Sequence, residues 1–421
     1  MVADNLSGIL QIVFSILAAS WWILLPLFFL FIFLDFWLMN VRREYISKIK
    51  WKLLEIKIPR EILKSPKAME IVFAALHSIQ SGIKFFDKWI KGQVPGWMTF
   101  EMTGHAGGVH FYVRIPEQFR NLVESAIYSQ YPNTEIIEVE DYVDLPPSIL
   151  PNKIYDVWGT NLILAKKDAY PIQTYEYFEE KMKEKRLDPT ATLIEALSKN
   201  NKDEMSWLQI LIRPVDDKWK KEAQKEINKL IGREEGIGRT AWGELEEFFR
   251  NLIKAPIIHP TWSDGKTEDS GGGLSALTAG EKDIVAAIEN KISKLGFETL
   301  VRFVYIDKAD SFTRGNISAV TGAFKQFNTQ HLNAFKADSH TAIKASQPFK
   351  ERKLYLLKRR IYDSYRLRFF PVFFKVKKMP ILNTEELATI YHFPTTFVEA
   401  PTLQRLDSRR GEPPAELPLI E

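Results

Sequence analysis

The pattern of hydrophobic positions begins with an uninterrupted apolar run from Ile9 to Leu34. These 26 positions hold no charged residue, and their polar side chains are those of Gln11, Ser15 and Ser20. A helix of this length would measure roughly 39 Å, which exceeds the ~30 Å hydrocarbon core of a bilayer. A helix buried in a soluble core is the alternative, but the run is apolar on every face. We therefore predict a transmembrane anchor over residues 1–40.

The residues that flank this run decide between a retained anchor and a cleaved signal peptide. A signal peptide needs basic residues before its apolar run, whereas Met1–Ser7 contains Asp4 and no Lys or Arg. From Arg42 to Lys67, nine Lys or Arg residues stand against three Glu residues. Such an excess is typical of the cytoplasmic side of a span. We expect a single-pass protein of the inner (cytoplasmic) membrane, with its N-terminus outside and residues 40–421 in the cytoplasm.

Residues 41–96 combine this basic juxtamembrane segment with a predicted amphipathic helix. Ser65 and Pro66 form a typical helix start, with Ser as the N-cap and Pro at the first helical position. Apolar residues then recur at steps of three and four up to Ile90, and Gly92 ends the pattern. The spacing predicts one helix of about seven turns.

Alternating and helical patterns follow one another from residue 97 onward. The predicted order is a strand, a Gly-rich turn, a second strand, a helix and a third strand: Trp97–Met102, Thr103–Gly108, Val109–Ile115, Glu117–Tyr131 and Glu135–Val139. A Pro-rich stretch, Leu145–Pro151, reads as a boundary or an extended connection. A strand over Tyr155–Leu164 and helices over 175–185 and 190–199 come next.

A strand, a break at Pro or Asp, and a helix recur three times along the chain. The strands are Val109–Ile115, Trp207–Ile212 and Leu300–Ile306. This repetition predicts an α+β fold in which one N-terminal transmembrane helix is followed by repeated ferredoxin-like β/α units with antiparallel sheets. We expect a first α+β domain over 97–262, a flexible Gly-rich linker over 263–280, a second α+β domain over 281–400, and a Pro-rich tail over 401–421. Thr278 and Glu281 predict a capping box.

The charge of the chain is concentrated in two places. The formal net charge is only +4, yet Lys350–Lys378 holds eleven Lys or Arg against two acidic residues. We predict a basic helix over Lys350–Arg368, then an aromatic strand over Phe369–Val376. This helix could bind nucleic acid or anionic lipid, or could present a solvated face. The candidate contact residues are Arg42, Arg43, Lys48, Lys50, Lys52, Lys358, Arg359, Arg360, Arg366 and Arg368.

The sequence contains no recognisable catalytic motif. It has no phosphate-binding loop, no zinc-protease or nucleophile-elbow motif, and no Cys. His105 and His110 lie five residues apart without a further ligand nearby, so we assign no metal. We expect no cofactor and no catalysis. A membrane-bound enzyme without a local signature remains the alternative.

Five phrases carry a resemblance to a known group of proteins: KSPKAMEIVFAALHSI, VHFYVRIPEQFRNLVESAIYSQYPNTEIIEVEDY, KKDAYPIQTYEYFE, FKQFNTQHLNAFK and ILNTEELATIYHFP. On the basis of these phrases, the chain resembles a group of poorly characterised membrane-anchored bacterial proteins, which are related to the N-terminal region of conjugative-transfer and type IV secretion ATPases. The resemblance covers Trp51 to Pro418. In longer members of that group the region precedes a motor domain of the DNA-translocase type. This sequence ends at Glu421, and no position matches an ATP-binding residue.

The resemblance implies a membrane-anchored accessory or scaffold component of a type IV secretion or conjugative DNA-transfer machine. It would dock a cytoplasmic motor or DNA to the inner membrane. The expected partners are the lipid bilayer, a separate translocase ATPase, nucleic acid, and other subunits of an oligomer or larger membrane complex. An anionic-lipid-binding scaffold is a further alternative, because the same basic segments would serve it.

The apolar run gives a direct prediction about extraction. The full chain should stay with inner membranes after carbonate treatment, because Ile9–Leu34 would be buried in lipid. The measurement is the distribution of the protein between pellet and supernatant. Release into the supernatant would show that the run does not span the bilayer.

Overall fold

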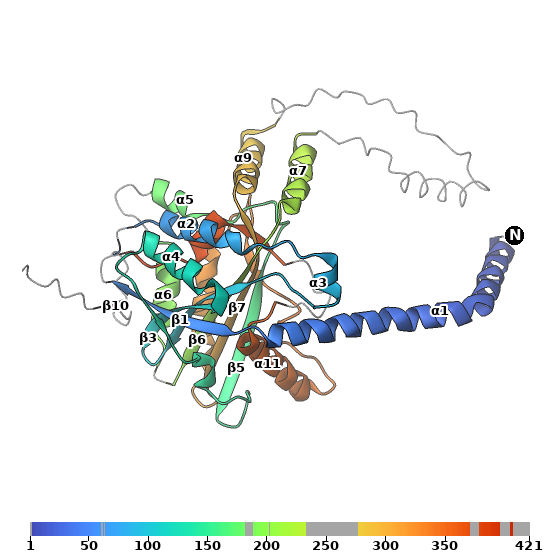
Figure 1. Ribbon diagram of the computed structural model, residues 1–421, viewed down its shortest axis with the longest axis horizontal. Helices are drawn as coiled ribbons and strands as arrows, with labels where there is room; N and C mark the ends of the chain where they lie inside the picture. The colour runs from blue at the N-terminus through green and yellow to red at the C-terminus, as the bar shows by residue number, and fades with distance from the viewer. Residues whose placement is uncertain are drawn as a thin grey trace, which may run out of the picture.

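In the computed structural model a single long helix precedes a body of mixed helices and strands. The structure describes residues 2–59, 62, 64–181, 188–201, 203–232, 277–370, 379–395 and 405–406. This helix, α1 (Val2–Ser47), projects away from the body (Figure 1). Its segment Ser20–Ser47 is long and apolar enough to cross a membrane. Most described side chains between Trp21 and Trp37 are exposed. No other helix in the described ranges meets this test.

The first part of the body is a ferredoxin-like unit. Its strands lie in the order β4-β1-β3-β2, and each neighbouring pair is antiparallel. Along the chain the order is strand, helix, strand, strand, helix, strand, as that fold requires. The elements are β1 (Trp51–Pro59), α2 (Lys67–Leu76), β2 (Met98–His105), β3 (Gly108–Pro116), α4 (Arg120–Gln130) and β4 (Glu135–Glu138).

The second part repeats this arrangement. Its strands lie in the order β8-β5-β7-β6, again with antiparallel neighbours. The elements are β5 (Tyr155–Leu164), α6 (Ala191–Ser198), β6 (Met205–Pro214), β7 (Gly296–Lys308), α10 (Arg314–Ala323) and β8 (Phe335–Ala337). Helix α5 (Tyr175–Lys181) precedes α6. Helices α7 (Lys218–Leu230) and α9 (Ala279–Ser293) are inserted between β6 and β7, where they pack on each other.

The two units join edge to edge through β2 and β6. These strands pair antiparallel from Met98–Ile212 to Gly104–Ser206, so both units share one sheet. Two short strands extend it, β9 (Ile381–Asn383) beside β7 and β10 (Arg405–Leu406) beside β1. The structure confirms the α+β class, the antiparallel sheet and the apolar N-terminal helix.

The expected domain boundaries do not coincide with these two units. The predicted domains 97–262 and 281–400 would separate β6 from β7, yet β6 pairs with β7 along its full length. The chain instead passes from the first unit to the second through a stretch that includes Leu145–Pro151, which the sequence pattern predicted to be a boundary or an extended connection. Most of the predicted linker, residues 263–276, lies outside the described residues.

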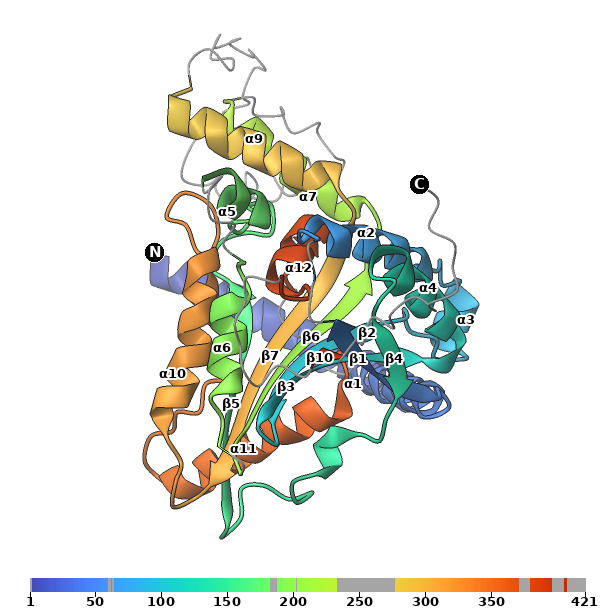
Figure 2. The ribbon, with the colours of Figure 1, turned by 90° about the vertical axis from the view of Figure 1, so that its left-hand side faces the viewer.

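Helices cover the two faces of the sheet unequally. Helices α2, α4, α6 and α10 lie on one face together with α12 (Thr384–Ile390), as Figure 2 shows. A capping box of Asn383 and Glu386 begins α12. Glu386 also forms a wholly buried ion pair with Lys291 of α9, with 3.0 Å between Nζ and Oε2. This ion pair connects α9, one of the two inserted helices, to α12 on the main core.

The opposite face carries α11 (Lys350–Leu367), the predicted basic helix. It lies across β5 and β7, on the side from which α1 departs (Figure 1). Its buried residues Ile361, Tyr362 and Tyr365 pack in one cluster with Trp207 of β6. The basic helix therefore has an apolar face that belongs to the core.

Two predictions near the N-terminus need correction. The helix expected from Ser65 to Gly92 ends with α2 and a 3₁₀ turn at Ile79, and a short helix, α3 (Phe85–Trp89), follows. Ser81 and Gly82 are weak helix formers, which accounts for the break. Strand β1 was missed inside the basic segment, although its apolar residues alternate with polar ones.

Other predictions are confirmed or lie outside the described residues. The capping box of Thr278 and Glu281 begins α9, as expected. Residues 371–378, most of the predicted aromatic strand, are not among the described residues, and of the tail 401–421 only Arg405–Leu406 are.

Candidate functional site

A row of polar side chains crosses six neighbouring strands on the sheet face that α11 covers. The strand register places them side by side in the order Glu55, Tyr112, Glu101, Gln209, Arg302 and Asn161. The row crosses the junction between the two units, where Glu101 faces Gln209. Polar groups in such a buried position are costly unless they are hydrogen-bonded.

Glu101 is the most heavily bonded member of the row. Its Oε1 accepts hydrogen bonds from the Thr99 hydroxyl, the Gln209 amide and Nε of Arg368, at 2.9, 2.9 and 2.7 Å. Its Oε2 accepts from the Tyr142 hydroxyl at 2.7 Å and from Nη2 of Arg368 at 3.0 Å. The carboxylate is thus satisfied by five donors without access to water.

Arg368 links this row to the end of α11. It terminates the helix in a left-handed conformation with φ of 50°, and its guanidinium turns back to the sheet. Besides Glu101, it pairs with Asp141 at 2.6 Å. Arg368 was expected to contact an external anion; it is fully buried and paired with two carboxylates, so this expectation is corrected.

Arg302 lies at the other end of the row in a different electrostatic setting. Its guanidinium donates to Oδ1 of Asn161 and Oε1 of Gln209, both at 3.1 Å, and to the backbone oxygen of Ser364. All three acceptors are neutral. Burial lowers the pKa of Arg302 to about 10, although Tyr365 and Glu101 act in the opposite direction. The side chain remains a cation at neutral pH.

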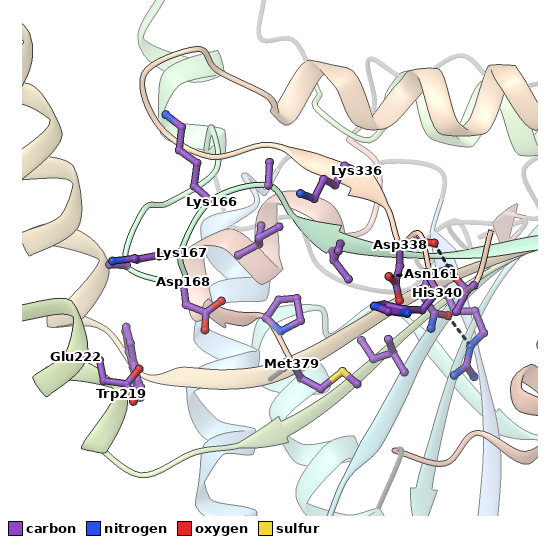
Figure 3. Close-up of a pocket in the computed structure, with 18 of the residues that line it drawn as sticks. Asn161, Lys166, Lys167, Asp168, Trp219, Glu222, Lys336, Asp338, His340 and Met379 are labelled. Carbon is purple, nitrogen blue, oxygen red and sulfur yellow. Dashed lines mark hydrogen bonds between the residues drawn. The ribbon is translucent and has the colours of Figure 1, made fainter. Parts of the chain in front are cut away.

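A pocket of about 1170 Å³ opens beside Arg302. Its walls come from β5, β7, β8, α7 and α11, together with Met379 and Pro380. Figure 3 shows Trp219 and Glu222 of α7 at one side and Asp338 and His340 at the other. The size is that of a site for an organic ligand rather than for a single ion.

The base of α1 is packed into the body near this pocket. Ile46 is buried in a cluster with Trp97, Leu300 and Met379. Gly92, at φ of 65°, approaches the backbone of Val41 so closely that a Cβ would lie 2.4 Å from the Val41 carbonyl carbon. Helix α1 is therefore fixed to the body at its C-terminal end.

The other candidate residues of α11 are mostly paired. Nζ of Lys358 lies 2.6 Å from Asp156, and Nη2 of Arg366 lies 2.7 Å from Asp144. Arg359 faces Asp363 on the same helix at 3.5 Å. Arg360 is exposed, forms no ion pair with a described residue, and lines the pocket.

The candidate residues near the end of α1 are more varied. Lys48 pairs with Glu44 at 2.7 Å, and Lys52 pairs with Glu138 at 2.5 Å. Arg43 and Lys50 are exposed, whereas Arg42 is half-buried against the body. Lys52 lies on the sheet face opposite α11, because its partner Glu138 also pairs with Arg120 of α4. Among the described residues, this set and the α11 set therefore form no common site.

His105 and His110 stack on each other across the β2–β3 hairpin. Their ring centroids are 4.3 Å apart, and both rings stack with Tyr112. Nδ1 of His110 lies 2.7 Å from Glu55, the first residue of the polar row. No cluster of three or more metal-ligating side chains occurs in the part of the chain that the structure describes.

The sequence interpretation missed Glu101, Gln209 and Arg302. Gln209 and Arg302 each interrupt an apolar run, in LQILI and VRFV, and Glu101 is the single charged residue of TFEMT. An isolated charge at an inward position requires a partner, and this requirement could have singled them out. The residues that pair with these side chains can be identified only from the three-dimensional structure.

Fold and site together define the class of protein: a single apolar N-terminal helix is followed in the sequence by two ferredoxin-like units that share one sheet. The chain belongs to a family described as a domain of unknown function, DUF8128, whose model matches residues 42–405. No curated protein matches the chain. The matched range includes the polar row, the pocket and the base of α1.

The buried network predicts a difference between Arg366 of α11 and Arg368, which follows the last residue of the helix. Arg368→Gln should lower the free energy of unfolding by ~3–5 kcal/mol, because it leaves Glu101 and Asp141 without their buried cation. Arg366→Gln makes the same chemical change at a partly exposed pair and should cost ~0–1 kcal/mol. Denaturant unfolding of the full chain in a neutral detergent measures both. Equal losses would contradict the central place of Arg368.

His105 predicts a loss of stability in acid. Burial, with the adjacent His110 charge acting the same way, lowers the pKa of His105 from 6.5 to about 4, although Glu55 opposes this. Between these pH values His105 binds more protons in the unfolded chain than in the folded chain. The free energy of unfolding should therefore fall as the pH decreases, by roughly 3 kcal/mol over the whole interval.

The test compares two histidine variants over this pH range. His105→Asn should flatten the dependence of the unfolding free energy on pH between 6.5 and 4. His331→Asn, at an exposed histidine, should leave the slope as in the native chain. An unchanged slope in His105→Asn would assign the acid sensitivity to other groups.

Proposed function

We propose that the protein is a membrane-anchored, non-catalytic component of a machine of the type IV secretion or conjugative DNA-transfer kind. Helix α1 holds it in the inner membrane, with the N-terminus outside and both ferredoxin-like units in the cytoplasm. Its role is to dock a cytoplasmic translocase ATPase at a fixed position on the membrane. The sequence resemblance supports the kind of machine, and the attachment of α1 supports the docking role.

The observation that carries this proposal is the rigid connection between α1 and the body. Only residues 48–50 separate the end of α1 from the start of β1. Ile46 is buried in the body, and Gly92 meets the backbone of α1 directly. A simple tether needs no such packing, whereas a protein that positions a partner does.

Helix α3 supports the same orientation. Phe85, Phe86 and Ile90 are exposed, with 78, 61 and 52 % of their surfaces accessible. The nearby Gly92 touches Val41, so α3 lies at the level where the apolar part of α1 ends. Exposed aromatic side chains at this level are suited to the membrane–water interface. We infer that α3 rests on the bilayer and limits tilting of the body.

The ion pairs of α11 favour a protein partner over DNA. Phosphate binding draws on unpaired Lys and Arg side chains. Lys358 and Arg366 of α11, and Arg368 directly after it, are instead engaged with carboxylates of the same chain. Arg360, which forms no ion pair with a described residue, lines the pocket. The exposed Arg43 and Lys50 beside the end of α1 are better placed for anionic lipid headgroups.

The test is photo-crosslinking of the full-length protein in its own cells. A photo-reactive residue replaces Tyr128, which is exposed on α4 away from α1, or Phe85 on α3. We expect a translocase ATPase to be captured from position 128, and lipid from position 85. Capture of no ATPase from position 128 would contradict the docking role.

Two glycine variants test whether the fixed orientation matters. Gly92→Ala should reduce the capture of the ATPase, because its Cβ would push against Val41 and shift α1. Gly107→Ala is the matched control: Gly107 has a similar φ of 79°, but a Cβ there would meet nothing within 4 Å. Equal capture by the two variants would show that α1 acts only as a tether.

A further inference from the structure

The pocket contains a buried cation without a carboxylate partner. Arg302 is 3 % exposed, and no acidic side chain in the described ranges forms an ion pair with it. Its Nε and Nη1 donate to neutral oxygens, while Nη2 has no hydrogen bond to a described residue. A buried guanidinium in this state can stabilise an anion brought into the pocket.

The rest of the lining combines positive charge with apolar surface. Seven Lys or Arg residues line the pocket against four Asp or Glu residues. Among the seven, Lys336 and Arg360 are exposed and form no ion pair with a described residue. Leu300, Leu357 and Met379 are among the apolar lining residues. An inorganic anion would leave this apolar surface unused.

The pocket also lies next to the base of α1. Leu300 and Met379 line the pocket and belong to the cluster that buries Ile46. Helix α11, which forms another wall, lies on the side of the sheet from which α1 departs (Figure 1). With α1 in a membrane, as the proposed function has it, the pocket lies on the side of the body that faces the bilayer.

We propose that this pocket binds an anionic amphiphile, whose phosphate or carboxylate pairs with Arg302 and whose apolar part lies along Leu300, Leu357 and Met379. Arg360 and Lys336 attract the anionic group at the entrance. The ligand comes either from the bilayer, as an anionic lipid, or from the cytoplasm, as a free amphiphile. The position of the pocket beside a bilayer rests on the proposed function. The chemical class of the ligand is inferred from the pocket residues alone.

The experiment measures binding to the full-length protein in nanodiscs of zwitterionic lipid. The probe is a fluorescent short-chain phosphatidic acid, and the control probe is phosphatidylcholine of the same chain length. We expect saturable binding of one phosphatidic acid per protein and much weaker binding of phosphatidylcholine. Similar affinities for the two probes would overturn the proposal.

Matched variants locate the site. Arg302→Gln should weaken binding roughly tenfold or more, because it removes a charge-assisted hydrogen bond. Arg360→Glu should weaken it roughly fivefold, whereas Arg352→Glu, on the same helix outside the pocket lining, should not. Arg360 is exposed, so its variant tests the site even where Arg302→Gln fails to fold. Equal effects of the Arg360 and Arg352 variants would place the binding elsewhere.

Competition distinguishes the sources of the ligand. Displacement of the probe by long-chain anionic lipid in the disc identifies the bilayer as the source, and probe binding without such displacement identifies a free amphiphile. Displacement by a nucleotide at comparable concentration would overturn the amphiphile assignment. None of these measurements involves a motor, so their failure is distinct from failure to capture an ATPase.

Discussion

The buried ion pair between Glu101 and Arg368 is the interaction on which the arrangement of the body depends. It joins the strand at the edge of the first unit to the helix that lies over the second. Because both side chains are inaccessible to water, each charge is tolerable only while the other is present. Asp141, in the connection between the units, is held by the same guanidinium. One arginine thus fixes three segments that are distant in sequence.

The duplicated fold explains why the polar row has two different ends. By their places in the two units, Glu101 corresponds to Gln209, Tyr112 to Arg302 and Glu55 to Asn161. In the first half, the carboxylate is neutralised by the end of α11. In the second half, the equivalent region holds an arginine with neutral partners beside a large pocket. Equivalent positions of the two units are therefore occupied by a buried ion pair in the first unit and border a pocket in the second.

Local patterns predicted the elements of this fold well, and its long-range arrangement poorly. The apolar run of α1, the strand Tyr155–Leu164 and the Thr278 capping box depend on neighbouring residues, so they were predictable. The partnership of Glu101 with Arg368 spans 267 residues and follows from no local spacing. The basic character of α11 was predicted, but its ion pairs were not, because Asp144 and Asp156 come from other segments.

The junction of β2 with β6 has a consequence for solubility. A ferredoxin-like unit alone would end in a long unpaired strand on the β2 or β6 side, and such edges can recruit strands from other molecules. Here those two edges satisfy each other. At the outer borders of the described sheet lie β4, β8 and β10, of four, three and two residues. The junction therefore removes two long edges from contact with other molecules, which lowers the risk of strand-mediated aggregation.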